Sequence, residues 1–150
     1  MSSRREVPVT IKALVPTPTG CGVFLTDGLK TIAIFVDHGV AAAITMAMHD
    51  VQKPRPLTHD LIINIMAGLG VVLQKVVIND LKDDTYFARL FLFQQIEGGK
   101  NMLEIDARPS DSIALALQLK APIFVLEDVL ARAEDMSWAL EQKKPDDDGT

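Results

Sequence analysis

Residues 71–107 read VVLQKVVINDLKDDTYFARLFLFQQIEGGKNMLEIDA, and this stretch is the most informative part of the chain for its architecture. It is rich in β-branched and aromatic residues, which favour strands. Two short segments, Lys82–Thr85 and Gly98-Gly99, carry the residues that favour turns. The pattern predicts an antiparallel meander with a four-residue turn followed by a two-residue turn. Its three strands are Val71–Asp80, Tyr86–Ile96 and Asn101–Ala107.

The residues on both sides of this meander extend it into an α+β domain. Alternating apolar residues predict strands at Val7–Val15, Cys21–Thr26, Leu29–Val36 and Ile123–Leu126, with Asp27-Gly28 as a two-residue hairpin turn. Apolar residues three or four apart predict helices that begin at Asp37 (as the N-cap) and at Thr58, and others over Ser110–Lys120 and Glu127–Gln142. In the second helix, the expected buried stripe is Ile62, Ile65, Met66 and Leu69.

We therefore expect a single α+β domain in which helices pack on one face of a mainly antiparallel or mixed sheet. Residues 7–142 form the predicted domain, residues 1–6 a flexible N-terminus, and residues 143–150 a disordered acidic tail.

The composition is that of a globular protein in a reducing compartment. The chain has 150 residues, of which 48% are hydrophobic and 23% charged, and it lacks an apolar run of the roughly 18 residues that span a bilayer. Its first six residues lack the apolar segment of a secretory signal. Cys21 is the single cysteine, which excludes an internal disulfide and a cysteine-based zinc site. We expect a cytoplasmic protein that does not contact a membrane.

The net charge of −5 argues against a uniformly basic surface of the kind that most nucleic-acid-binding proteins present. Part of the acidic excess lies in the C-terminal segment PDDDGT at residues 145–150. A site for a polyanion would therefore have to be a local basic pocket.

The predicted register of the last hairpin places charged residues on one face of the sheet. With Gly98-Gly99 as the turn, Phe91 lies opposite Asp106, and Arg89 lies diagonal to Asp106. Glu104 shares this face, and two carboxylates at such spacing are about 6.6–6.8 Å apart, which suits a divalent cation such as Mg²⁺ or Mn²⁺. The alternative is a half-exposed strand face with an Arg89–Asp106 ion pair.

Two helix starts share an Arg-Pro pattern, Arg55-Pro56-Leu57-Thr58-His59-Asp60 and Arg108-Pro109-Ser110-Asp111-Ser112. Proline holds the preceding arginine extended, and the helix start offers free backbone N–H groups to a phosphate. The arginine adds a bidentate fork. The residues predicted to bind substrate are Arg55, Thr58, Arg89, Arg108, Ser110 and Ser112. The alternative is that Thr58 and Ser110 are ordinary N-caps and that the arginines pair with the neighbouring aspartates.

These stretches resemble the bifunctional nuclease domain proteins of bacteria and plants. The resemblance spans roughly residues 7 to 133, and its longest motif is Ile105-Asp106-Ala107-Arg108-Pro109-Ser110-Asp111-Ser112-Ile113-Ala114-Leu115-Ala116. Other matching segments are Leu14-Val15-Pro16, Gly22-Val23-Phe24-Leu25, Pro54–Leu61 and Thr85–Leu90. The resemblance implies a compact α+β domain, a homodimer, and activity on both RNA and DNA.

Two functional hypotheses follow. In the first, the protein is a nuclease in which Asp106, with Glu104 or Asp111, binds a metal ion or activates water. His59 is a secondary acid–base candidate because its ordinary pKa lies near neutrality; the alternative for His59 is a surface histidine. In the second hypothesis, the protein is a non-catalytic anion-binding module with a regulatory or interaction role, which the acidic net charge favours. A third alternative is a structural subunit whose Trp138 helix docks a partner.

Overall fold

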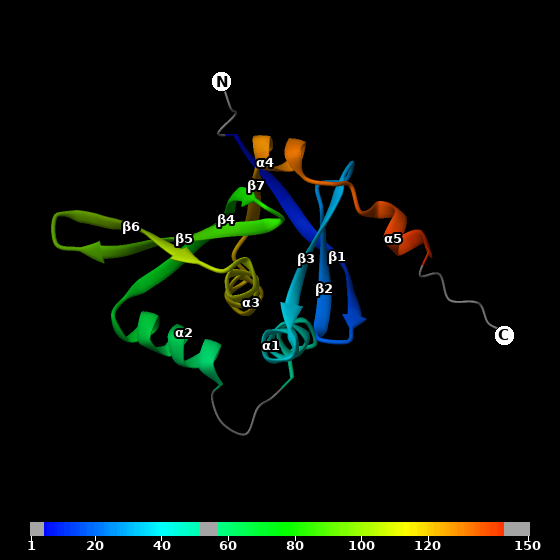
Figure 1. Cartoon of the computed structure of the whole chain (residues 1–150). Coiled ribbons are helices and arrows are strands. Elements are labelled where there is room, and N and C mark those ends of the chain that lie inside the picture. Colours follow the sequence, from blue (N-terminus) through cyan, green and yellow to red (C-terminus); the bar gives the residue numbers. More distant parts are fainter. Residues whose placement is uncertain (1–4, 52–56, 143–150) are drawn as a thin grey trace.

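The computed structural model describes residues 5–51 and 57–142, and it confirms the predicted α+β class (Figure 1). The strands are β1 (Glu6–Thr17), β2 (Gly20–Thr26), β3 (Thr31–Asp37), β4 (Val71–Lys82), β5 (Thr85–Ile96), β6 (Gly99–Ala107) and β7 (Ile123–Leu126). The helices are α1 (His38–Met48), α2 (Thr58–Gly68), α3 (Pro109–Leu119), α4 (Glu127–Arg132) and α5 (Ser137–Gln142). Among the described residues, no helix has the length and apolar character needed to cross a membrane.

The seven strands form one mixed sheet with the order β3-β2-β1-β7-β4-β5-β6. It consists of two antiparallel meanders joined by the short strand β7, which pairs antiparallel with β1 and parallel with β4. A parallel pair requires a crossover connection, and α3 supplies it between β6 and β7. Figure 1 shows α3 at the centre of the molecule, where it packs on β4, β5 and α1.

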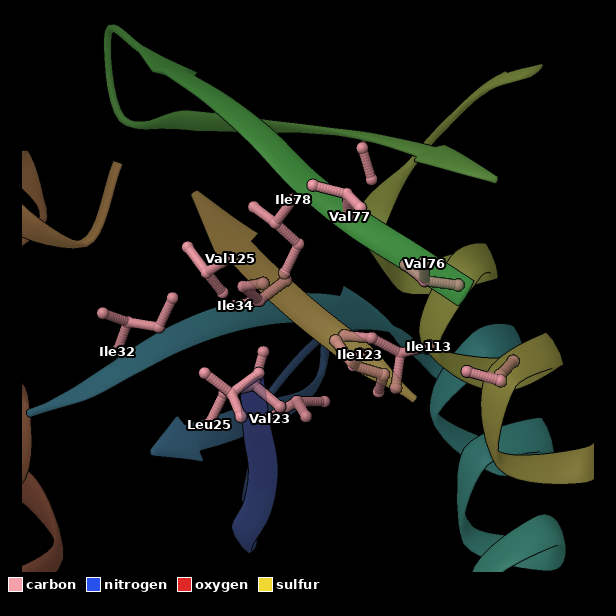
Figure 2. Packing of buried hydrophobic residues seen from close by; sticks show 14 of the residues in the cluster. Val23, Leu25, Ile32, Ile34, Val76, Val77, Ile78, Ile113, Ile123 and Val125 are labelled. Atoms are coloured by element: carbon pink, nitrogen blue, oxygen red, sulfur yellow. The ribbon is translucent and has the colours of Figure 1, made fainter. Parts of the chain in front are cut away.

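The hydrophobic core lies where the two meanders and α3 meet (Figure 2). The buried side chains labelled there are Val23, Leu25, Ile32, Ile34, Val76, Val77, Ile78, Ile113, Ile123 and Val125. Strand β7 is apolar throughout because it is paired on both edges at the middle of the sheet. The start of α3 is therefore anchored by a core to which both halves of the chain contribute.

Replacing Ile113 with alanine is expected to lower the free energy of unfolding by about 2–5 kcal/mol, because the Ile113 side chain is fully buried and its truncation leaves a cavity. Urea unfolding followed by circular dichroism measures the change. Leu29→Ala is the control, since Leu29 is 93% exposed and should change stability by no more than about 0.5 kcal/mol. Equal effects of the two substitutions would contradict the position of α3 in the core.

The first hairpin turn is longer than predicted. Thr26 pairs with Thr31, which leaves a four-residue loop in place of the expected two-residue Asp27-Gly28 turn. The Asp27 carboxylate accepts the backbone N–H groups of Leu29 and Lys30, and only Gly28 in this loop has a positive φ, of 103°. The loop is therefore an Asx turn, which is closed by the Asp27 side chain, and not the predicted two-residue hairpin turn.

Both turns of the second meander also differ from the prediction. The first is a two-residue turn, because Asp83 and Asp84 adopt positive φ angles of 50° and 64°; aspartate tolerates this region better than most residues. The second is Glu97-Gly98 rather than Gly98-Gly99. Its effect is a shift of two residues in the pairing of β5 with β6, and an even shift keeps every side chain on its predicted face.

The buried stripe predicted for α2 is half wrong. Ile62 and Met66 pack against the core, but Ile65 is 53% and Leu69 62% exposed. Helix α2 contacts β4 and α3, and it lies at the margin of the molecule (Figure 1). An apolar face of α2 is therefore left on the surface.

The last predicted helix is divided in two. Helix α4 ends at Arg132 and α5 begins at Ser137. Between them, the Asp135 carboxylate accepts backbone N–H groups from Thr31 and Ser137, and the Met136 N–H donates to the Thr31 carbonyl. These bonds to the start of β3 replace the helical bonds that a continuous helix would have made.

Candidate functional site

A hollow of about 540 Å³ opens where the β4–β5 hairpin, the end of β6 and the start of α3 meet. The observed register places Arg89 directly opposite Asp106 rather than diagonal to it. From Asp106 the chain leads through Ala107 to Arg108, the N-cap of α3. We call this cavity the Asp106 hollow. Its charged and phenolic lining residues are Asp80, Lys82, Tyr86, Arg89, Asp106 and Arg108.

Arg89 forms ion pairs with both acidic residues of β6. Its Nη1 lies 3.2 Å from Glu104 Oε1, and its Nε lies 3.2 Å from Asp106 Oδ1. The second contact is an ion pair without hydrogen-bond geometry, so the buried Nε has no hydrogen-bond partner among the described residues. The Arg89–Asp106 ion pair predicted as the alternative is therefore present. The Asp106 side chain is 88% exposed, and surface ion pairs contribute roughly 0–1 kcal/mol, so a ligand can displace it.

Glu104 and Asp106 do not form a ready metal site. Both carboxylates face a guanidinium, and the part of the chain that the structure describes contains no group of three or more His, Cys, Asp or Glu side chains arranged to hold a metal ion. Asp80 lines the same hollow, but it is paired with Arg132. The donor set does not fit a divalent cation without displacement of an arginine.

A second polar cluster links the starts of the helices α2 and α3. His59 Nε2 lies 3.0 Å from Asp111 Oδ1, and Arg108 Nε lies 2.9 Å from Asp111 Oδ2. Arg108 Nη1 is also 3.8 Å from the carboxylate of Asp37, the N-cap of α1. His59 is buried rather than at the surface, and it lines neither of the hollows described here. In this arrangement His59 and Asp111 orient Arg108.

Asp111 is held ionised by these two partners. Burial acts to raise its pKa, but hydrogen bonds from Arg108 and His59 outweigh burial and leave the pKa below the ordinary value. A carboxyl whose folded-state pKa is lowered stabilises the fold above its ordinary pKa and loses this contribution as the pH falls through the folded-state pKa.

The stability difference between the wild type and Asp111→Asn is therefore expected to be largest near pH 6 and to shrink as the pH falls from about 4 to about 2. Urea unfolding at a series of pH values measures this difference. A difference that grows towards low pH would contradict the lowered pKa of Asp111.

The helices α2 and α3 begin one and two residues before the predicted N-caps Thr58 and Ser110 would place them. The N-caps are Leu57 and Arg108, and neither makes a side-chain capping bond. Proline at the first helical position explains the displacement in α3, because its fixed φ already suits the helix. Thr58 thus becomes the first residue of α2, and Ser110 becomes the second of α3.

Some of the predicted substrate-binding residues line a hollow, and others do not. Ser112 is fully buried and donates its hydroxyl to the Arg108 carbonyl, which is a structural contact. Thr58 lines neither hollow, whereas Arg89 and Arg108 line the Asp106 hollow together. The prediction for Arg55 lies outside the described residues.

A second cavity of about 650 Å³ adjoins the Asp106 hollow. We call it the Ser110 hollow. It shares Thr85, Tyr86 and Arg108 with the Asp106 hollow. Its other lining residues with functional side chains include Phe35, Asp84, Ser110, Arg132 and Glu134.

Arg132 and Tyr86 were not predicted as site residues from the sequence. Arg132 donates to the Leu81 carbonyl at 2.6 Å and pairs with Asp80 at 3.2 Å. Arg132 is the single basic residue within 127–142. Its isolation in an acidic segment is the sequence feature that could have indicated a role in the site. For Tyr86, burial and the nearby carboxylates of Asp84 and Glu134 raise the pKa of the phenol.

The fold and this site together define an α+β domain with arginine-lined, mixed-charge hollows at the junction of a sheet and a helix start. Comparison with known proteins identifies the family of this domain. Residues 23–137 match the bifunctional nuclease domain, and the chain belongs to this family.

Two kinds of relative are similar to the chain. An uncharacterized protein of Mycobacterium tuberculosis is 42% identical over 107 residues, which cover 71% of this chain and 61% of the relative. Bifunctional nuclease 2 of Arabidopsis thaliana is 30% identical over 122 residues, 79% of this chain and 36% of the relative. Bifunctional nuclease 1 of rice (Oryza sativa subsp. indica) is 27% identical over 63% of this chain and 28% of its own length. The chain therefore spans less than two thirds of the length of each of these relatives.

Proposed function

We propose that the protein hydrolyses phosphodiester bonds in RNA or DNA at the Asp106 hollow. The observation that carries the proposal is that Arg89, Arg108 and Asp106 line one cavity. Arg89 lies on β5, Asp106 on β6, and Arg108 is the N-cap of α3. Guanidinium groups bind phosphate oxygens bidentately, and a carboxylate can accept a proton from water. Membership of the bifunctional nuclease domain family supports this class of reaction.

The proposed reaction begins with a phosphate bound between Arg89 and Arg108. Binding would draw Arg89 away from Asp106, whose freed carboxylate accepts a proton from water. The water oxygen then bonds to phosphorus, the bond from phosphorus to the leaving ribose oxygen breaks, and that oxygen takes a proton from solvent. The phenol of Tyr86 is protonated at neutral pH, as an ordinary tyrosine is, and the upward shift of its pKa keeps it so. It can therefore donate a hydrogen bond to the phosphate.

A divalent ion, Mg²⁺ or Mn²⁺, stays a prediction for this site. Because both carboxylates of β6 pair with Arg89, we route no step of the reaction through a metal. Assay with and without EDTA tests the requirement directly.

The proposed function is tested with fluorescently labelled single-stranded RNA and DNA across the fractions of a final size-exclusion column. Cleavage is expected to follow the protein peak in proportion to concentration for both nucleic acids. Cleavage that elutes away from the peak would be a contaminating nuclease and would overturn the proposal.

The second candidate is a non-catalytic anion-binding module that uses the same hollows. The net charge of −5 and the carboxylates that face every arginine of the site favour modest anion binding. Fluorescence anisotropy separates the two functions: binding of oligonucleotides without any cleavage at the protein peak would favour the module.

We also propose that two copies of the chain associate through the exposed apolar face of α2. Leu57, Leu61, Ile65 and Leu69 recur every four residues, and each is 41–62% exposed. This spacing places them on one side of a helix. The 11 residues of α2 include Asp60 and His59 as their titratable groups, so a second copy of this acidic chain meets little like charge there.

Leu61→Asp is therefore expected to convert a dimer into a monomer in light scattering coupled to size-exclusion chromatography. Leu29→Asp is the matched control, because Leu29 is even more exposed but lies in the loop of the first hairpin. A wild-type protein that is monomeric at about 100 μM, or a dimer that survives Leu61→Asp, would overturn the interface.

A further inference from the structure

We propose that the Ser110 hollow is a nucleotide-binding site that holds the phosphate group at the start of α3. Its volume of about 650 Å³ lies within the usual range for small-ligand pockets. The cavity combines hydrogen-bond donors at one helix start, two arginines, an exposed aromatic ring and two carboxylates.

The donors at the helix start are available to a ligand. The first N–H groups of an α-helix lack intrahelical acceptors. Pro109 has no N–H, so Ser110 is the first residue of α3 that can offer such a donor to the hollow. Ser110 is only 8% exposed and lines the hollow. Over residues 5–51 and 57–142, its hydroxyl has no hydrogen-bond partner. The Ser110 oxygen is not among the side-chain atoms that are buried without a partner, so it keeps access to the hollow that Ser110 lines. A phosphate oxygen bound there can accept its hydrogen bond.

Two arginines from different helices reach the same cavity. Arg108 is the N-cap of α3, and Arg132 is the last residue of α4. Their side chains are 63% and 47% exposed, so each guanidinium has donors free for a ligand beyond the contacts that position it. Arg132 is positioned by the Leu81 carbonyl and by Asp80. Two guanidinium groups that are held in place beside the N–H groups of a helix start can bind a phosphate dianion.

The rest of the lining favours a nucleotide over inorganic phosphate. Phe35 is 64% exposed, and an aromatic face of this kind can stack on a base. The carboxylates of Asp84 and Glu134 line the same hollow and can accept hydrogen bonds from ribose hydroxyls or base amino groups. Inorganic phosphate would use none of these groups.

The position of the Ser110 hollow relates it to the proposed cleavage site. Thr85, Tyr86 and Arg108 line both hollows, so one nucleic-acid strand could place neighbouring nucleotides in the two hollows. This relation rests on the proposed nuclease function. A base stacked on Phe35 is unpaired, so the preferred substrate class would be single-stranded nucleic acid.

The test is calorimetric titration of the full chain with 5′-AMP and with adenosine, for the wild type, Ser110→Ala and Arg132→Gln. AMP is expected to bind at least about tenfold more tightly than adenosine, because charge-assisted hydrogen bonds to the phosphate are lost in adenosine. Arg132→Gln should weaken AMP binding about tenfold and Ser110→Ala severalfold, with adenosine unaffected. Lys12→Gln, an exposed position on β1 outside both hollows, should leave both titrations unchanged.

Equal affinity for AMP and adenosine, or no detectable binding of AMP, would overturn the nucleotide site. The melting temperature of each variant is measured in parallel, and Ser110→Ala keeps the test valid if Arg132→Gln does not fold. Oligonucleotide cleavage is assayed on the same samples. Cleavage without AMP binding overturns this site alone, whereas AMP binding without cleavage overturns the nuclease function alone.

Discussion

Asp106→Ala is expected to reduce phosphodiester cleavage at least about 100-fold, the lower range for loss of a general base. The same substitution should leave the melting temperature within about 4 °C of the wild type. The reason for this separation is structural: the Asp106 side chain is 88% exposed, and its ion pair with Arg89 lies at the surface. The carboxylate therefore contributes little to the fold, although it lies in the hollow with both arginines.

Initial rates on a labelled single-stranded oligonucleotide and thermal unfolding of the same samples measure these two quantities. Glu97→Ala is the matched control, because Glu97 is an exposed carboxylate in the turn at the far end of the same hairpin. If Asp106→Ala destabilised the fold as strongly as it lowered activity, Asp106 would be a structural residue. Unchanged cleavage would remove it from the reaction.

Arg108→Gln is expected to lower kcat/KM about 10- to 100-fold, because hydrogen bonds from a charged donor to a phosphate are lost. Of the residues that line both hollows, Arg108 is the charged one, and Asp111 orients it through a 2.9 Å hydrogen bond. Arg108→Lys keeps the positive charge but loses the planar fork. We therefore expect its kcat/KM to lie between those of the wild type and Arg108→Gln.

Steady-state cleavage and oligonucleotide anisotropy measure the effects on rate and binding. Arg5→Gln is the control, since it removes an arginine whose surface ion pair with Glu127 lies outside both hollows. If Arg5→Gln and Arg108→Gln lowered activity equally, the effect would be one of net charge, and the local site would be wrong.

The strands were predictable because each is a run of β-branched and aromatic residues with turn-forming residues on either side. The turns were less predictable. Asp83-Asp84 and Asp27 show why, because aspartate can either adopt a positive φ itself or close a longer loop with its side chain. Which solution is used depends on the twist and pairing of the flanking strands, and these are properties of the sheet.

The Asp106–Arg108 half of the site was predictable because those residues are two apart in the sequence, at the junction of a strand and a helix. Arg132 was not, since it reaches the site only when β7 and α4 follow the crossover back to β4. The burial of His59 was not predictable either. It depends on the packing of α2 beside α3, and a first-turn histidine has the same local sequence whether buried or exposed.

The amino-acid order alone was sufficient for the element types, the face on which Arg89, Glu104 and Asp106 lie, and the extended arginine before Pro109, because these follow from side-chain alternation and from the proline ring. Folding was needed to bring Arg108 and Arg132 to one cavity, to place Ser110 in the lining of that cavity, and to expose the apolar side of α2. Those features arise from contacts between segments distant in the chain, and such contacts leave no local periodicity for a sequence pattern to reveal.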